Sequence, residues 1–217
     1  DDLAEARRLA QTFVSEAKAT GDPAAIVETM TGQLTLLTWV AERADEAIPV
    51  GQRLRVLSDS LYGPDHRMTR VATSTLAHAL GLAGRHREAI VLYHESLRAN
   101  IRVHGAGSRD EAYVHITLGD EYRKLGEYRA SREQMRIGIE MAVPYIGASH
   151  RDVGWWRVSL AELHNRLGEH AEAEAEGRLA LAIADADSAA ALRARALGEA
   201  GLAVAGQGRR EEAQDVL

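Results

Sequence analysis

The sequence has 217 residues, of which 46% are hydrophobic and 27% are charged, and its formal net charge is −6. Because it contains no block of lysines or arginines, this negative charge argues against direct binding to nucleic acid or to an anionic membrane. The sequence has no cysteine, which excludes disulfides, thiolate chemistry and sulfur-rich metal sites.

Helix-forming residues dominate the composition. Ala, Leu, Glu and Arg are abundant, whereas there are only four prolines and one phenylalanine, so the sequence favours helices over strands. No apolar run approaches the roughly 20 residues that span a bilayer, and no signal peptide is visible, so we expect a cytoplasmic protein. The sequence begins with Asp1 instead of methionine, and we expect it to be part of a longer protein.

Two series of glycines recur along the sequence with one period. The first series, in the segments GDP, GPDHR, GAGSRD and GASHRD, consists of Gly21, Gly63, Gly105 and Gly147, whose sequence numbers differ by 42 at each step. The second series, in GRHREA, GEYRAS, GEHAEA and GRREEA, consists of Gly84, Gly126, Gly168 and Gly208, whose sequence numbers differ by 42, 42 and 40. A fixed period of this length predicts a repeat protein in which each unit is one supersecondary structure.

In chain order, the apolar residues between these glycines follow helical spacing and predict a pair of helices in each unit. Residues 1–20 are expected to form the second helix of a unit that lacks its first helix. Four units follow at 22–62, 64–104, 106–146 and 148–186, and a truncated unit occupies 188–217. We therefore expect a single array over residues 1–217.

The ends of the helices have their own signals. Asp22 is expected to cap the helix that starts at Pro23, because proline is favoured in the first turn. The series that begins at Gly21 is expected to end each unit in a left-handed C-cap, and the series that begins at Gly84 to form the turn within each helix pair. His66 and His150 recur at matched positions, and we interpret them as contacts at the start of a helix and not as metal ligands.

The segments Leu118-Gly119-x-x-Tyr122 and Ala89-x-x-x-Tyr93 resemble the signature of the tetratricopeptide repeat. The 42-residue period is similar to that of its kinesin-light-chain-like subclass, which is common in bacterial proteins. This resemblance implies an all-α fold, a right-handed superhelical solenoid of tetratricopeptide-type helix-turn-helix repeats. Small residues such as Ala77, Gly119 and Ala161 are then expected to pack against large ones.

Two adjacent tryptophans occur near the start of the unit at 148–186. Trp156 shares a helical stripe with Leu160 and Leu163, so we expect it in the core. Trp155 has Ser159 and Glu162 at i+4 and i+7, on the face that lines the inside of tetratricopeptide arrays. It is either an anchor for a bound peptide or a ring that packs on the preceding unit near Tyr113.

The resemblance also implies a peptide-binding groove on the concave face. Its expected residues are Val71, Ser74, Thr75, His78, Tyr113, Thr117, Asp120, Arg123, Lys124, Trp155, Ser159, Glu162, Asn165 and Arg166. Arg123, Lys124 and Arg166 are expected to pair with a carboxylate of the ligand. The alternative is that this strip is only the solvent-exposed face of the array.

In kinesin-light-chain-like repeats, asparagines at corresponding groove positions hold the backbone of the ligand. Here Thr75, Thr117 and Ser159 occupy these positions, so the ligand class can differ from that of the subclass.

The sequence shows no pattern for catalysis. Its nine histidines include no His-Glu-x-x-His motif, and no glycine forms a phosphate-binding loop. We expect no enzyme, no metal and no cofactor. The expected function is a non-catalytic interaction module that binds a peptide or helix of a protein partner in its groove. One alternative is a structural or regulatory spacer within a larger bacterial signalling protein, such as a kinase or transcriptional regulator, and another is self-association of the array.

Overall fold

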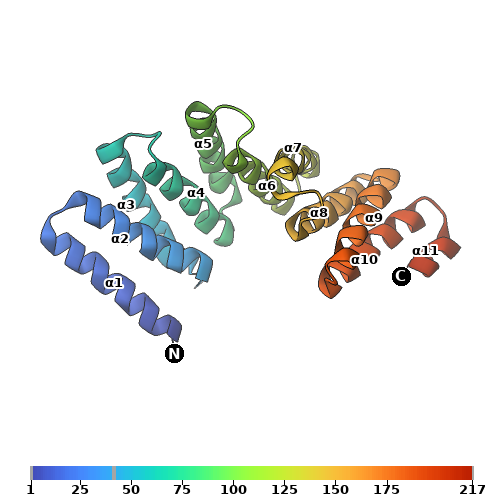
Figure 1. Cartoon of the computed structure of the whole chain (residues 1–217), viewed down its shortest axis with the longest axis horizontal. Helices are drawn as coiled ribbons and strands as arrows, with labels where there is room; N and C mark the ends of the chain where they lie inside the picture. Colours follow the sequence, from blue (N-terminus) through green and yellow to red (C-terminus); the bar gives the residue numbers. More distant parts are fainter. Residues whose placement is uncertain (1, 41–42, 217) are drawn as a thin grey trace. The chain divides into compact units, whose positions relative to one another are not determined.

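The computed structural model describes residues 2–40 and 43–216, and all elements of these residues are helices (Figure 1). The first elements in chain order are α1 (Asp2–Thr20), α2 (Pro23–Thr35), the π-helical turn η1 (Leu36–Val40), α3 (Ala44–Tyr62), α4 (Arg67–Leu82) and α5 (His86–His104). They are followed by α6 (Arg109–Lys124), α7 (Tyr128–Ile146), α8 (Arg151–Leu167), α9 (His170–Ala186), α10 (Ala190–Gly206) and α11 (Arg210–Val216). The prediction of an all-α fold is confirmed.

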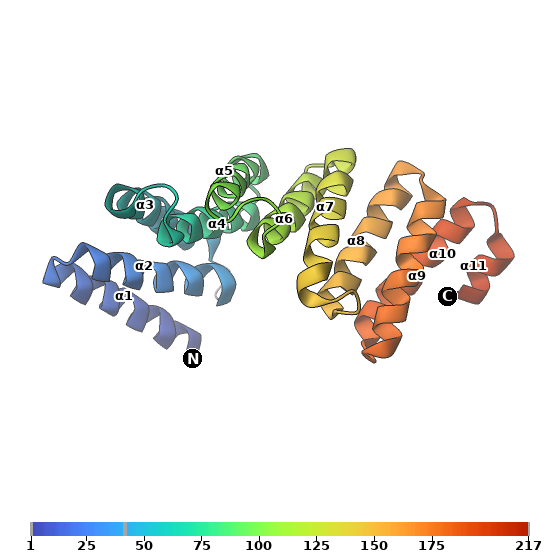
Figure 2. The same cartoon turned by 45° about the horizontal axis from the view of Figure 1, so that its top comes forward.

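The chain divides into two compact units, Asp1–Ala106 (unit 1) and Gly107–Leu217 (unit 2). Within each unit, consecutive helices lie side by side and run in opposite directions, as Figures 1 and 2 show. The helices of each unit therefore bury their apolar faces against their neighbours along the chain, as repeat proteins do. No described helix combines the length and the apolar character that crossing a bilayer requires.

Side-chain caps start several of the helices. The Asp22 carboxylate accepts a hydrogen bond of 2.9 Å from the Ala24 backbone N–H, and Pro23 occupies the first turn, as predicted. His66 and His150 cap α4 and α8, because the Nδ1 atom of each accepts a hydrogen bond from the backbone N–H two residues later, at 3.3 and 3.2 Å. The interpretation of these two histidines as contacts at the start of a helix is confirmed.

The start of α6 has a reciprocal cap at the position that matches these histidines. The Ser108 hydroxyl accepts a hydrogen bond of 3.2 Å from the Glu111 N–H, and the Glu111 carboxylate accepts one of 2.7 Å from the Gly107 N–H. This arrangement is a variant of the capping box, because the Glu111 carboxylate accepts from the residue before the N-cap, and two backbone donors at the helix start are satisfied.

The glycines of the two series adopt positive φ angles, but in two different conformations. Gly168 has φ 76° and ψ 15°, the left-handed helical conformation that many residues tolerate poorly. Gly63, Gly105 and Gly147 combine φ of 83°, 75° and 88° with ψ of 167°, 172° and 145°. The predicted left-handed C-cap is thus wrong at these three positions. An extended ψ directs the chain away from the helix axis toward the next unit, and this region is almost restricted to glycine.

Close packing between the two helices of a pair is most evident at Gly119. A Cβ atom added there would lie 2.5 Å from Met135 Cγ and 3.1 Å from the Met135 backbone nitrogen. The buried Ser131 hydroxyl donates a hydrogen bond of 2.6 Å to the Gly119 carbonyl oxygen. Ala77 and Ala161, at the corresponding positions of α4 and α8, are fully buried. A residue with little or no side chain therefore lets the paired helices approach closely.

The core of unit 2 holds α8 and α10 in place. Val153 and Leu163 from α8 and Leu192 and Ala196 from α10 have no exposed surface, and they form one cluster with buried residues of α9. Each of the valine and leucine side chains contributes roughly 1.5–3 kcal/mol of burial free energy. The outer faces of α8 and α10 are thus presented from a rigid support.

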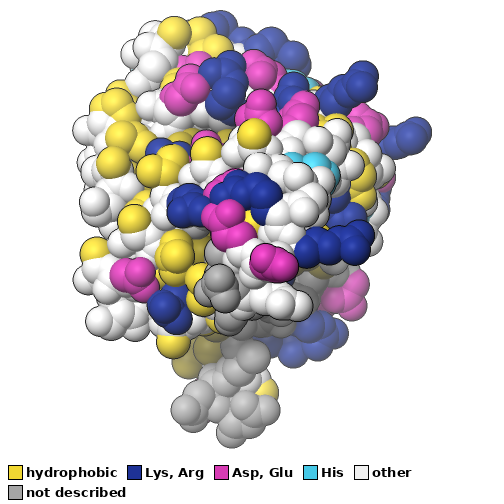
Figure 3. Space-filling model, turned by 90° about the vertical axis from the view of Figure 1, so that its right-hand side faces the viewer, with side chains coloured by type: hydrophobic (Ala, Val, Ile, Leu, Met, Phe, Trp, Pro, Cys, Tyr) yellow, Lys and Arg dark blue, Asp and Glu magenta, His cyan; other side chains and the backbone are white. Residues whose placement is uncertain are grey.

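Ion pairs and hydrogen bonds attach the turn between α10 and the short C-terminal helix α11 to α9. The Glu174 carboxylate of α9 accepts hydrogen bonds from Gln207 and Arg209, at 2.8 and 2.7 Å, and pairs with Arg178 of its own helix at 2.7 Å. Acidic and basic side chains accordingly lie next to one another at the C-terminal end, with hydrophobic side chains exposed beside them (Figure 3).

We predict that Gly119→Leu lowers the free energy of unfolding by about 3 kcal/mol, because the new side chain overlaps Met135 and forces α6 and α7 apart. The measurement is urea unfolding followed by circular dichroism. The control is Gly198→Ala in α10, where no atom lies within 4 Å of the added Cβ, and we expect it to stabilise the protein by about 0.5–1 kcal/mol. An unchanged unfolding transition for Gly119→Leu would contradict the packing argument.

The two glycine conformations predict different tolerance of asparagine. Neither Gly105 nor Gly168 has an atom within 4 Å of an added Cβ, so a substitution tests the backbone conformation alone. Asparagine adopts the left-handed helical conformation with little strain, so Gly168→Asn should cost less than about 1 kcal/mol. Gly105→Asn should cost about 2 kcal/mol or more, because its ψ lies in the region reserved for glycine. Equal thermal midpoints for the two variants would refute this difference.

Candidate functional site

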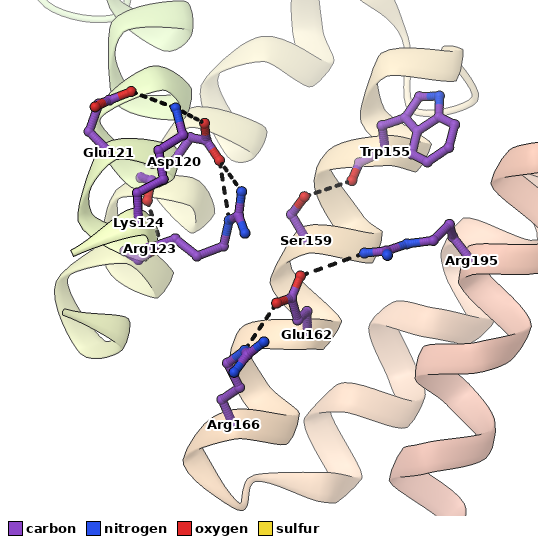
Figure 4. A network of polar contacts seen from close by, with 11 residues as sticks. Asp120, Glu121, Arg123, Lys124, Trp155, Ser159, Glu162, Arg166 and Arg195 are labelled. Atoms are coloured by element: carbon purple, nitrogen blue, oxygen red, sulfur yellow. Dashed lines mark hydrogen bonds and ion pairs between the residues drawn. The ribbon is translucent and has the colours of Figure 1, made fainter. Parts of the chain in front are cut away.

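Three helices of unit 2 present a row of polar side chains on one face. They are α6, α8 and α10, the first helix of each successive pair, and Figure 4 shows the side chains that project from them. Asp120 and Arg123 project from α6, Glu162 and Arg166 from α8, and Arg195 from α10. Their spacing of three or four residues keeps those of each helix on one face.

The predicted cations of α6 are already paired within the helix. Arg123 Nη2 lies 2.6 Å from Asp120 Oδ1, and Lys124 Nζ lies 2.9 Å from Asp120 Oδ2 and 2.8 Å from Glu121 Oε1. Burial raises the pKa of the Asp120 carboxyl, but the hydrogen bonds from Arg123 and Lys124 outweigh it and hold this pKa below its ordinary value. Burial lowers the pKa of Lys124, yet the neighbouring carboxylates raise it overall. These groups are therefore charged at neutral pH.

Glu162 connects α8 with α10. It accepts a hydrogen bond of 3.0 Å from Arg166 Nε, and its second oxygen lies 3.6 Å from Arg195 Nη2. The Arg166 guanidinium also lies 5.3 Å from the centre of the Tyr128 ring, within the range of a cation–π contact. One carboxylate is thus shared by two arginines that are each about half exposed.

Asn165 makes a second connection to α10. Its Nδ2 atom donates to the Glu199 carbonyl oxygen at 3.0 Å and to a Glu199 carboxylate oxygen at 3.1 Å. The amide therefore fixes the distance between the two helices at this point.

These side chains line a groove of about 500 Å³. Its lining residues are Arg123, Glu162, Asn165, Arg166, Arg195, Glu199 and Leu202. The first four belong to the predicted groove, whereas the three from α10 were missed. The repeat itself contained the signal. The last interval of the glycine series, from Gly168 to Gly208, is 40 residues, and 40 residues separate Arg195, Glu199 and Leu202 from Trp155, Ser159 and Glu162.

Thr117 and Ser159 occupy positions at which kinesin-light-chain-like repeats have asparagines, and their hydroxyl groups donate hydrogen bonds to the backbone of their own helices. Thr117 Oγ1 donates to the carbonyl oxygens of Tyr113 and Val114, at 3.1 and 2.9 Å, and Ser159 Oγ donates to Trp155 O at 3.2 Å. Their remaining capacity is to accept a hydrogen bond. In unit 1, Thr75 is buried with 7% of its surface exposed, so it offers little to a ligand.

The two tryptophans have different environments. Trp156 packs against the core cluster of unit 2, as predicted, and its ring meets the Tyr113 ring edge to face with 5.6 Å between centroids. The aromatic partner of Tyr113 is therefore Trp156 and not Trp155. Trp155 has 37% of its surface exposed, and it projects from α8 above Ser159 in the same row as Glu162 (Figure 4).

The predicted residue His78 belongs to unit 1 and has an aromatic partner that sequence reasoning missed. Its ring stacks on Trp39 with 3.9 Å between centroids and 10° between planes, and Trp39 is 56% exposed. Trp39 lies in the π-helical turn η1, and such turns are frequent at functional sites. A regular helical pattern gives no signal for this turn, so the sequence could not place Trp39 beside His78.

No described residues form a group of three or more His, Cys, Asp or Glu side chains that could hold a metal ion.

Comparisons with known proteins add the family. The family model described as Tetratricopeptide repeat matches residues 27–100 and 70–142. Among solved structures, the chain is similar to BtubC (BKLC) from P. vanneervenii, with 18% identity and a TM-score of 0.79 over 100% of this chain and 89% of that one. No curated protein matches the chain in sequence.

Two further structures are similar to the chain. A putative kinesin light chain of Podospora anserina with nearly identical TPR-like repeats has 16% identity and a TM-score of 0.70, over 99% of this chain and 91% of that one. A Rap protein complexed with Competence and Sporulation Factor has 10% identity and a TM-score of 0.64, over 96% and 68%. At these identities the structures show a common fold.

The environments of the two tryptophans predict effects of different size when each side chain is truncated. Trp156→Ala should lower the free energy of unfolding by about 2–4 kcal/mol, because it leaves a cavity beside the core and removes the Tyr113 contact. Trp155→Ala should cost less, about 1 kcal/mol, because its ring is partly exposed and lies outside the core cluster. Urea unfolding of the two variants checks this, and a larger loss for Trp155→Ala would show that its ring has a packing role.

Proposed function

Because the chain belongs to the tetratricopeptide repeat family, with repeats of the kinesin-light-chain-like type, we propose that it binds a peptide or helix of a protein partner in the groove of unit 2. Tetratricopeptide repeats generally mediate protein–protein interaction and form non-catalytic scaffolds. The observation that carries the proposal is the convergence of side chains from α6, α8 and α10 on one groove.

The charges of the groove are suited to exchange of partners. The pairs Asp120–Arg123 and Glu162–Arg166 are partly exposed and lie within single helices. Such pairs contribute no more than about 1 kcal/mol each, so replacing one internal carboxylate with a carboxylate of the ligand costs little. The arginine then exchanges its internal carboxylate for that of the ligand, and the free energy of unfolding changes little.

The helix faces beside the groove also offer groups for a peptide backbone and for an apolar side chain. The oxygens of Thr117 and Ser159 accept hydrogen bonds, so they match backbone N–H groups of the ligand. The exposed ring of Trp155 gives apolar area at low entropic cost. In unit 1, the Trp39–His78 stack offers a second exposed aromatic surface.

A structural neighbour supports a binding role for this fold. The Rap protein structure contains Competence and Sporulation Factor, so an array of this fold holds a factor in that case. We extend this capacity to the present chain, with the partner contacts assigned to its own groove residues.

The experiment begins with selection of peptides from a random display library on the whole chain, followed by affinity measurement by fluorescence polarisation. We expect Trp155→Ala and Arg166→Ala each to weaken the selected peptides by about tenfold or more, which corresponds to about 1.4 kcal/mol. The loss follows from removal of the exposed ring and of one of the guanidinium groups in the groove.

The matched control is Arg136→Ala in α7. Arg136 resembles Arg166 because it pairs with carboxylates of its own helix, Glu133 and Glu140, and is about half exposed. It lies outside the groove, so affinity should change by less than about twofold. Equal affinity of wild type, Trp155→Ala and Arg166→Ala would overturn the proposal and favour a structural or regulatory spacer.

A further inference from the structure

A second pocket lies in unit 1 between α3, α4 and α5, which are neighbours along the chain (Figures 1 and 2). It has a volume of about 250 Å³. Arginines from all three helices line it, namely Arg55, Arg70, Arg98 and Arg102. The lining contains two carboxylates, Asp59 and Glu95, so the pocket concentrates positive charge in a protein whose net charge is negative.

Two of these arginines have a carboxylate partner. Arg55 Nη2 lies 2.6 Å from a Glu95 oxygen, and Arg102 contacts Asp65 through both Nη2 and Nε, at 2.5 and 3.0 Å from Oδ1. The hydrogen bond from Arg102 lowers the pKa of the Asp65 carboxyl, and the charge of Arg70 contributes to this shift. Glu95 is thus engaged by Arg55, Arg102 is engaged by Asp65 outside the lining, and Asp59 is an exposed carboxylate of the lining.

The other two arginines are not compensated in this way. Arg98 is exposed and makes no ion pair with another described residue. Arg70 Nη1 donates to the amide oxygen of Asn100, which is neutral, and Arg70 Nε is buried without a hydrogen-bond partner among the described residues. Arg70 as a whole is only partly buried, but a guanidinium nitrogen that is buried without a partner is costly, so this arrangement favours a ligand with negative charge.

The repeat shows that these polar residues are additions to the fold. The positions that match Arg70 in the next two units hold Ala112 and Gly154, and the position that matches Asn100 holds Ala142. All three are buried. Helix pairing therefore does not require an arginine or an asparagine at these positions, and packing alone does not explain their presence in unit 1.

The hydroxyl groups of the pocket determine where the hydrogen bonds to a ligand originate. Thr69 Oγ1 donates to Gly63 O at 2.9 Å, and Thr73 Oγ1 donates to Thr69 O at 2.8 Å. Since these two protons are already used, donation to an anion falls to the guanidinium groups and to the Ser96 hydroxyl, which also lines the pocket. Guanidinium forks match the oxygen geometry of phosphate and carboxylate groups.

We propose that this pocket binds a phosphate group, either of a small phosphorylated compound or of a phosphorylated side chain of another protein. A phosphate monoester carries a charge of about −1.5 to −2 at neutral pH and has three strong acceptor oxygens. Its charge can therefore balance the charges of both Arg70 and Arg98, whereas a carboxylate, with a single negative charge, balances only one of the two positive charges. This site is separate from the groove of unit 2, so its test does not depend on the proposed function.

The test is titration of the whole chain with inorganic phosphate at constant ionic strength, followed by nuclear magnetic resonance of ¹⁵N-labelled protein. We expect saturable shifts concentrated at the pocket residues of α4 and α5. Arg98→Gln and Arg70→Gln should each weaken phosphate binding by at least about fivefold. Arg98 is exposed, so its variant keeps the test decisive if Arg70→Gln does not fold.

The matched control is Arg53→Gln, which removes an exposed arginine of α3 that does not line this pocket, and it should bind phosphate like wild type. Absence of saturable shifts, equal binding of acetate, or wild-type affinity in Arg98→Gln would each overturn the proposal. A peptide with phosphoserine distinguishes the sources. Binding tighter than that of inorganic phosphate supports a phosphorylated side chain, and equal binding supports a small compound.

Discussion

The close contact between the two helices of a repeat is the constraint on which the rest of the structure depends. At Gly119 this contact leaves no room for a Cβ atom, because Met135 lies against the backbone of α6, and the Ser131 hydroxyl fills the remaining space with a hydrogen bond to the Gly119 carbonyl. A repeat array has no central core, so each pair must bury enough surface with its immediate neighbours to be stable. Once the pair is fixed, the outer face of its first helix is fixed as well, and with it the side chains that line the groove.

The two polar sites differ in how far their charges are compensated. In the groove of unit 2, Arg123 and Arg166 each have a carboxylate one turn away on the same helix, so the surface is stable without a ligand and exchanges partners at low cost. In the pocket of unit 1, Arg70 has only the amide of Asn100, and its Nε atom is buried without a partner among the described residues. The groove is thus suited to a ligand that competes with internal ion pairs, and the pocket to an anion that completes the site.

Many groove residues were predictable, since a position that faces the groove in one repeat unit predicts that the matching position of the next unit also faces it. Arg123, Glu162, Asn165 and Arg166 were identified in this way, and the same transfer identifies Arg195 and Glu199 once the shorter last interval of the glycine series is used. The partner of each side chain was not predictable. Asn165 bonds to Glu199 and Tyr113 meets Trp156 because of the distance and rotation between neighbouring helices, which the period alone does not specify.

The sequence by itself determined the helix pairs, their period and the glycines between them, because these depend on local conformation and on the spacing of apolar residues. Only the tertiary structure decided which glycines use an extended ψ, that a π-helical turn brings Trp39 onto His78, and that four arginines from three helices converge on one pocket. The physical reason is that these features depend on the relative positions of neighbouring helices. Those positions are set by the packing of many side chains at once, and no single stretch of sequence contains that information.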